Sequence, residues 1–335
     1  MLLALVVQAP QAIAGPPQPS AVICGHQVQG AILAKYQEMG GEKSPLGCPK
    51  TDELTTPNGV GRYNTFVGGS IYWSPDTGAH PVWGVIGEKW GALGWEAGSL
   101  GFPVSDELAN PDGVGKRQQF QSGTIYWHPT LSDGAHAVSG RIGWVWSGFH
   151  WESGAFGYPT SDALYDNDNK EYDQRFSNHL TIFESSTGND IEGCKGPCAG
   201  YYGVVPDNQS ASDLVNEARV ELPLDNTLGL SDWKHAFVVR AWPTLKARLG
   251  AAAAAGPDWD QIWQRVPRPW DMNPTNQSSI YKQLVCHTMF SAPKPGGWAG
   301  GPSWDFESWR SDIPWLRVMT PSSSPNWGNN ECNWN

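Results

Sequence analysis

Apolar and polar positions recur along the first half of the chain with a period of about 54 residues. Each period opens with an apolar pair at helical spacing, such as Ile86 and Trp90, which predicts a short helix with one buried face. Its second half alternates apolar and polar residues, as at 117–121 and 124–127 around Gly123, and this alternation predicts a β-hairpin. Each period is therefore expected to fold as a helical turn, a loop and a hairpin that pack against neighbouring periods.

A four-residue turn motif lies between the helical and the alternating part of each period. It reads Leu-Gly-Cys-Pro at 46–49, Leu-Gly-Phe-Pro at 100–103 and Phe-Gly-Tyr-Pro at 156–159, and its prolines lie 54 and 56 residues apart. Residues on both sides repeat in step with the motif, which identifies an array of three tandem copies. These residues are a helical aromatic (Tyr36, Trp90, Trp146), an acid (Glu42, Glu96, Glu152), an aspartate (Asp52, Asp106, Asp162) and a phenylalanine (Phe66, Phe120, Phe176).

A different composition follows the repeats. Residues 193–230 are rich in turn formers and predict a bridge, whereas 236–242 is typical of a strand and 278–287 of a helix. We therefore expect a β-rich α+β fold. Three helix-loop-hairpin copies of about 54 residues pack together over 30–192, and a smaller, disulfide-linked α+β domain follows over 231–335. The third copy lacks the Gly-x-Ile-Tyr-Trp strand of the other two and is expected to cap the array.

Charge and the N-terminal sequence limit the class of protein. The net charge is −11 and no segment is basic, so nucleic acid and anionic lipid are not expected partners. The apolar run at 1–14 ends in a small-x-small pattern that is typical of a secretory signal, and 15–29 is a linker rich in Pro and Gln. No other stretch reaches the roughly 18 apolar residues that span a bilayer. We expect a secreted protein without a transmembrane segment.

Six cysteines fit an exported chain, in which an even number of cysteines indicates disulfides. Six cysteines allow 15 pairings, and proximity in the sequence favours Cys24–Cys48, Cys194–Cys198 and Cys286–Cys332. Cys194 and Cys198 also have the spacing of zinc ligands, but no second Cys or His pair lies nearby. Asp166 and Asp168 could begin a calcium loop, but the glycine and distal glutamate of such a loop are missing. We expect no metal site and no cofactor.

Tryptophan is the residue type that most suggests a ligand, because the chain has 19 of them and an indole offers a flat apolar face with a polar edge. An indole beside a carboxylate suits a sugar, since ring C–H groups pack on the indole and hydroxyls donate to the carboxylate. Each hydrogen bond contributes only about 0.5–1.5 kcal/mol, but tandem sites gain avidity on a polymer. The recurring residues that we predict to contact glycan are Trp95, Glu96, Asp106, Tyr126, Trp127, His136, Trp151 and Glu152.

Several of these residues also have a structural interpretation. The aspartates follow Ser or Thr and can close turns through backbone hydrogen bonds, and His136 can brace its hairpin loop. Trp90 and Trp146 pair with Ile at helical spacing, which favours burial. No hydrolase, nucleotide or phosphate-loop motif is present. His287, upstream of Asp305, is a candidate general base, but we favour a packing role for it and a protein that is not an enzyme.

The turn motif, with Ile-x-x-Lys-Trp upstream and Gly-x-Ile-Tyr-Trp downstream, resembles the LGFP repeat of actinobacterial cell-envelope proteins over about 30–190. The second copy is a near-complete match: Ile86, Lys89, Trp90, residues 100–103, Asp106, Phe120, Gly123, residues 125–127 and 134–136. The resemblance implies a module that holds exported proteins to the arabinogalactan layer of the cell wall. Cys48 departs from the Phe of the motif. Residues 234–335 resemble an uncharacterised C-terminal domain of exported actinobacterial proteins, which implies no known activity.

These observations favour an exported cell-envelope protein whose repeats bind arabinogalactan-like cell-wall polysaccharide and anchor a C-terminal domain of unknown activity. One alternative is a wall-anchored hydrolase or transferase that acts through His287 and nearby carboxylates. Another is a structural envelope protein without a ligand. Solvent exposure of Trp95, Trp127 and Trp151 would favour a binding protein over a structural one.

Overall fold

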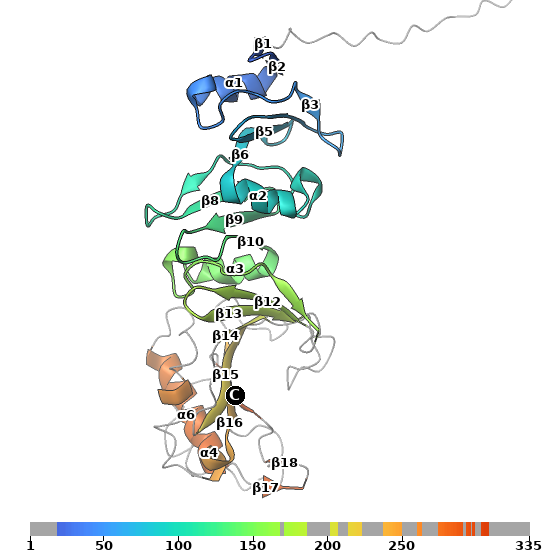
Figure 1. Ribbon diagram of the computed structural model, residues 1–335. Helices are drawn as coiled ribbons and strands as arrows, with labels where there is room; N and C mark the ends of the chain where they lie inside the picture. Colours follow the sequence, from blue (N-terminus) through green and yellow to red (C-terminus); the bar gives the residue numbers. More distant parts are fainter. Residues whose placement is uncertain are drawn as a thin grey trace, which may run out of the picture. The chain divides into compact units, whose positions relative to one another are not determined.

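A computed structural model of the protein (Figure 1) divides into two compact units, Met1–Glu107 and Leu108–Asn335. The structure describes residues 19–167, 171–185, 202–206, 214–222, 237–249, 260–262, 274–290, 293–295, 297–298 and 303–307. The predicted signal segment at 1–14 and most of the predicted bridge at 193–230 lie outside these residues.

The first unit consists of a hairpin, two short helices and one antiparallel sheet. Its elements are β1 Ser20–Ile23, β2 His26–Gln29, α1 Gly30–Glu38, η1 Gly41–Lys43, β3 Leu54–Thr55, β4 Arg62–Thr65, β5 Gly69–Ser74, β6 Gly78–Trp83, α2 Gly84–Ala92 and η2 Trp95–Ala97. Strands β1 and β2 form the hairpin that leads into α1, and β3 to β6 pair in sequence order and lead into α2. A single 3₁₀ turn, η1 or η2, follows each helix.

The second unit repeats this order and then departs from it. Its elements are β7 Leu108–Ala109, β8 Lys116–Phe120, β9 Gly123–Trp127, β10 Ala135–Ser139, α3 Gly140–Gly148, η3 Trp151–Ser153, β11 Leu164–Asp166, β12 Glu171–Phe176, β13 Leu180–Ser185, β14 Tyr202–Pro206, β15 Val215–Leu222, β16 Val238–Pro243, α4 Leu245–Leu249, α6 Pro274–Phe290, β17 Pro293–Lys294, β18 Gly297–Trp298 and β19 Trp304–Glu307. Strands β7 to β10 form a four-stranded sheet, and a seven-stranded sheet has the order β11-β12-β13-β14-β15-β16-β19. All of the pairs are antiparallel.

The prediction of a β-rich fold with short helices and hairpins is confirmed, and the expected hairpin of the second copy is β8 and β9. Each of the two four-stranded sheets is larger than a hairpin. It gains a two-residue strand, β3 or β7, and a strand that runs directly into the next helix, β6 or β10. A two-residue strand is too short to show an alternating pattern, so the sequence predicts no strand there.

The separate C-terminal domain expected over 231–335 is not confirmed. Strands β11 to β13, which follow the third turn motif, belong to the same seven-stranded sheet as β14, β15, β16 and β19. The strand predicted at 236–242 is β16, and the helix predicted at 278–287 lies within α6. Backbone hydrogen bonds therefore continue across the expected domain boundary. Strand β14 pairs with β13 on one side of it, and β15 pairs with β16 on the other, which satisfies their backbone amides and carbonyls.

One buried aromatic side chain anchors each short helix. Tyr36, Trp90 and Trp146 are all buried, as the spacing from Ile predicts for the two tryptophans. Trp90 packs edge-to-face on Tyr72 with ring centroids 4.7 Å apart, and its Nε1 donates to the carbonyl of Gly101 in the turn motif at 3.1 Å. The Tyr36 hydroxyl makes the equivalent bond to the first turn motif at 2.8 Å. A nine-residue helix is unstable alone, so this contact holds helix and turn motif together.

The third residue of the turn motif fills the turn before the preceding copy's hairpin. The Phe102 ring lies against Gly61 so closely that a Cβ on that glycine would be 2.6 Å from Phe102 Cε1. Tyr158 lies in the same way against Gly115, where a Cβ would be 2.6 Å from Tyr158 Cζ. The Tyr158 hydroxyl also donates a hydrogen bond to the Asp112 carboxylate. A side chain at either glycine would collide with the ring, so consecutive copies fit only with glycine there.

The first turn motif has a cysteine at this position. Cys48 is disulfide-bonded to Cys24 between β1 and β2, which confirms the predicted pair. Cys286 in α6 is also disulfide-bonded. The other cysteines of the predicted pairs, Cys194, Cys198 and Cys332, lie outside the described residues. A covalent link thus occupies the place where later copies insert an aromatic ring.

Replacing Gly115 by Ala should lower the free energy of unfolding by about 1–3 kcal/mol, because the new methyl group overpacks the site against Tyr158. Removing the ring as well, in Gly115→Ala/Tyr158→Ala, should cost less than the sum of the two single changes, because the collision disappears. Urea denaturation of the four proteins measures this coupling, and the exposed Val114→Ala is the control. Strict additivity would contradict direct contact between the two residues.

The Asp112 carboxylate should make stability depend on pH in the acid range. Burial alone would raise its pKa, but hydrogen bonds from Tyr158, Val114 and Gly115, together with nearby His128, hold the pKa below the ordinary 3.8. A carboxyl whose folded pKa is lowered stabilises the fold above its unfolded pKa, and this stabilisation is lost as pH falls through the folded value.

Asp112→Asn should therefore be less stable than wild type at pH 7, and the two proteins should converge below about pH 3. Denaturation midpoints measured from pH 7 down to pH 2.5 test this, with the exposed Asp76→Asn as the matched control. A difference that persists unchanged at the lowest pH would rule out the ionised carboxylate as its source.

Candidate functional site

A hollow of about 550 Å³ lies on the first unit between helix α2 and strands β5 and β6. The buried rings of Tyr72 and Trp90 form part of its lining. Glycines at 87 and 91 keep the surface of α2 low, and a Cβ at Gly91 would be 3.1 Å from Trp95 Nε1. The absence of a side chain at Gly91 therefore lets the Trp95 indole lie against the helix.

Three of the larger lining side chains reach solvent, namely Trp83 at the end of β6, Glu88 in α2 and Trp95 in η2. The Trp95 side chain is 54% exposed, Trp83 is partly buried and Glu88 is exposed. The hollow thus combines two indoles and a carboxylate above a floor of glycine and buried rings. Indole faces can pack against sugar C–H groups, and the carboxylate can accept hydrogen bonds from hydroxyls.

The backbone of Trp95 is held in a conformation that tryptophan disfavours. Its φ is 51°, Trp151 has a φ of 50° at the same place in the next copy, and Gly41 has 61° in the preceding one. The left-handed region costs a residue with a Cβ about 1–2 kcal/mol, whereas glycine adopts it freely. Both tryptophans are at least half exposed, so burial compensates only in part. A strained, exposed ring kept at one place in two copies indicates a role outside the fold.

The two predicted glutamates lie inside the copies. Glu96 is only 6% exposed, and its Oε1 has no hydrogen-bond partner among the residues that the structure describes. Burial, and then the Glu96 charge, raise the pKa of Tyr72. Burial and the Glu152 charge raise the pKa of Tyr126 in the same way, and Glu152 itself is partly buried. The acid at this position thus acts on the tyrosine of the preceding copy's hairpin.

Asp106 and His136 belong to histidine–aspartate pairs that occur at three equivalent places along the chain. The Nδ1–Oδ1 distances are 3.5 Å for His26–Asp52, 2.7 Å for His80–Asp106 and 3.7 Å for His136–Asp162. Lys35 Nζ donates to the other oxygen of Asp106 at 3.0 Å. Each pair joins the strand before a helix to the segment after the turn motif, so Asp106 and Asp162 hold their copies against the preceding one.

The two predicted hairpin aromatics of the second copy differ in exposure. Tyr126 is buried and packs edge-to-face on Trp146 with ring centroids 4.8 Å apart. Trp127 is partly buried on β9, where it pairs with Ala135 and Lys116. Trp151 is 50% exposed. Of the predicted contact residues, Trp95 and Trp151 therefore present the most open rings.

Sequence reasoning did not single out Trp83 or Glu88. Trp83 is the last residue of a strand whose existence the pattern does not predict, and Glu88 reads as an ordinary solvent-facing residue of α2. The signal that could have found Glu88 is its spacing from Trp95. Seven residues span about two helical turns, so a helix continued from α2 to residue 95 would place both side chains on one face.

His287 lies in an aromatic environment. It is buried, with ring centroids 6.3 Å from Trp304 and 5.8 Å from Phe306. The Asp305 carboxylate accepts hydrogen bonds from Arg240 Nε at 3.0 Å and from Ser303 Oγ at 3.1 Å. The Asp305 carboxylate thus forms an ion pair with the buried Arg240 of the neighbouring strand β16.

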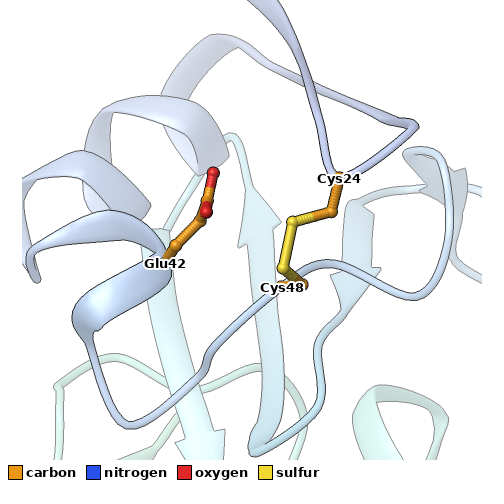
Figure 2. A group of neighbouring side chains, drawn as sticks. All are labelled: Cys24, Glu42 and Cys48. Atoms are coloured by element: carbon orange, nitrogen blue, oxygen red, sulfur yellow. A yellow bond between two sulfur atoms is a disulfide. The ribbon is translucent and has the colours of Figure 1, made fainter.

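One group of possible metal ligands occurs among the described residues, namely Cys24, Glu42 and Cys48. Figure 2 shows the Glu42 carboxylate beside the two sulfurs, which are bonded to each other. Thiolates are the form of cysteine that binds metals, so this group is a disulfide with a neighbouring acid. Of the predicted alternative calcium loop, Asp168 lies outside the described residues.

Comparison with known proteins assigns the repeats. The family model described as the LGFP repeat matches residues 46–98 and 100–154. None of the curated proteins compared with the chain matches it. The chain thus contains two LGFP repeats, a first at 46–98 and a second at 100–154, and the Trp95 hollow lies wholly within the first. No helix in the described part of the chain is long and apolar enough to cross a membrane.

Replacing Trp95 by glycine should change the free energy of unfolding by no more than about 1 kcal/mol, because relief of backbone strain offsets the lost packing and the flexibility of glycine. Replacing the buried Trp90 by alanine should cost about 3–5 kcal/mol. Chemical denaturation of both variants provides the comparison. A loss for Trp95→Gly as large as that for Trp90→Ala would show that Trp95 serves the core.

Proposed function

We propose that the protein is an exported cell-envelope protein whose LGFP repeats bind neutral cell-wall polysaccharide of the arabinogalactan type. The observation that carries this proposal is the exposed, backbone-strained Trp95 at the rim of a hollow that also presents Trp83 and Glu88. Sugar rings offer the C–H faces and hydroxyls that two indoles and a carboxylate can engage.

Charge supports a neutral polymer as the ligand. The chain carries a net charge of −11, and Glu88 stands at the hollow. An anionic polymer would be repelled by the protein's field and by that carboxylate. The Cys24–Cys48 disulfide supports export, because disulfides persist in oxidising compartments outside the cytosol. The resemblance to cell-envelope LGFP proteins supplies the choice of arabinogalactan. We propose no activity for residues 231–335.

Full-length protein should bind soluble arabinogalactan in affinity electrophoresis and isothermal titration calorimetry. Trp95→Ala should weaken binding about tenfold, since loss of one aromatic anchor costs roughly 1–2 kcal/mol. Glu88→Gln should weaken it about threefold by removing a charged acceptor. These changes should leave the melting temperature near that of wild type, because both side chains are exposed.

Val85→Ala is the matched control, since Val85 is an exposed residue of α2 that does not line the hollow. Cellulose and polygalacturonate serve as neutral and anionic comparison polymers. Wild-type affinity in Trp95→Ala would place the site elsewhere. Failure of the wild type to bind arabinogalactan, or equal binding to polygalacturonate, would refute the proposed ligand.

A further inference from the structure

The second LGFP repeat contains counterparts of three aromatic residues that line the hollow of the first. Tyr126 and Trp146 occupy the places of Tyr72 and Trp90, and their rings meet at 4.8 Å and 79° against 4.7 Å and 85°. Trp151 stands where Trp95 stands. Helix α3 has the same nine-residue length as α2 and is likewise followed by a 3₁₀ turn.

Two lining positions differ between the repeats in a compensating way. Where the first repeat has Trp83 at the end of its strand, the second has Ser139. Where the first has Glu88 on its helix, the second has Trp144, which is 46% exposed. The second repeat thus carries its second indole on the helix instead of the strand, and it has no carboxylate at the position of Glu88.

Position 147 differs as well, because a serine side chain stands where the first repeat has bare helix surface beside Trp95. The first repeat has Gly91 there, and the second has Ser147, whose Oγ donates to the carbonyl of Trp144 at 2.7 Å. The serine hydroxyl is therefore used within the turn of α3 that carries Trp144. The pair of exposed rings in the second repeat is Trp144 and Trp151, seven residues apart like Glu88 and Trp95, which line one hollow.

The segment before the first LGFP repeat lacks these features. Helix α1 has Ala34 at the position of Glu88 and Gln37 at that of Gly91, and the strained position is Gly41. The fold therefore forms without an exposed ring at this position. Rings are present in the two matched LGFP repeats and absent from the preceding segment, so they are not a requirement of the helix and its 3₁₀ turn.

We propose that the second LGFP repeat carries a second sugar site, formed by Trp144 and Trp151, which binds an uncharged glycan by stacking and makes the protein bivalent. This inference rests on the proposed function, because it assumes that the Trp95 hollow binds glycan. Two half-exposed indoles without a carboxylate favour contact with sugar faces over hydrogen bonds to hydroxyls. Two linked sites can raise the apparent affinity for a polymer about a hundredfold without new contacts.

The test is titration calorimetry of the full-length protein with a short arabinofuranosyl oligosaccharide that can occupy a single site. Wild type should bind two molecules per chain, and Trp95→Gly and Trp151→Gly should each bind one. Trp144→Ala should weaken the second site about tenfold. Glycine is the chosen substitution at 95 and 151 because Gly41 already occupies the equivalent backbone position, and thermal melts confirm that each variant is folded.

Long arabinogalactan provides the second readout. Each single variant should lose most of the avidity of the wild type, and Trp95→Gly/Trp151→Gly should not bind. If Trp95→Gly abolishes all binding while Trp144→Ala and Trp151→Gly bind like wild type, the second site is wrong and the proposed function stands. If wild type binds neither the oligosaccharide nor the polymer, both proposals fall.

Discussion

The contact on which the repeat structure depends is the one between the aromatic residue of each short helix and its surroundings. Trp90 touches Tyr72 of the hairpin with one part of its indole and donates to the turn motif with another. Tyr36 does the same through its hydroxyl. Because a nine-residue helix has little stability of its own, this contact positions the helix, the 3₁₀ turn behind it and the ring at residue 95. The rim of the hollow is therefore placed by a residue that lies buried beneath it.

The periodic pattern predicts features that neighbouring residues determine, and it does not predict how distant strands pair. It predicts the helices, the β8–β9 hairpin, the burial of Trp90 and the Cys24–Cys48 bond, each of which follows from spacing. It does not predict the two-residue strands, which are too short to alternate. It also misses the seven-stranded sheet, in which β16 pairs with the distant β19 through Val238 and Glu307. It names Trp95 and Trp151 as contact residues, but Glu96 and Asp106 look like ligand groups only until their internal partners are known.

The repeats show how one architecture separates residues for folding from residues for recognition. Histidine–aspartate pairs recur along the array, and His80–Asp106 and His136–Asp162 each join one copy to the next. The exposed rings recur only in the two LGFP repeats, where the backbone is strained to hold them. Conformational strain that glycine would remove is thus confined to the positions that face solvent. Such strain is compatible with a stable fold because the buried aromatic contacts around it supply a larger free energy.

The continuous seven-stranded sheet has a consequence for how the protein can be divided. Strand β13 closes the last copy, yet one of its edges is covered by β14 and, through it, by β15 and β16. A cut between β13 and β14 would uncover a row of unpaired amide and carbonyl groups on each side, and exposed edges of this kind promote association between chains. Proteolysis there would yield two fragments that associate through their unpaired strand edges, and neither a free binding module nor a free C-terminal domain would result. Because they share one sheet, the last copy and the C-terminal strands are expected to unfold together.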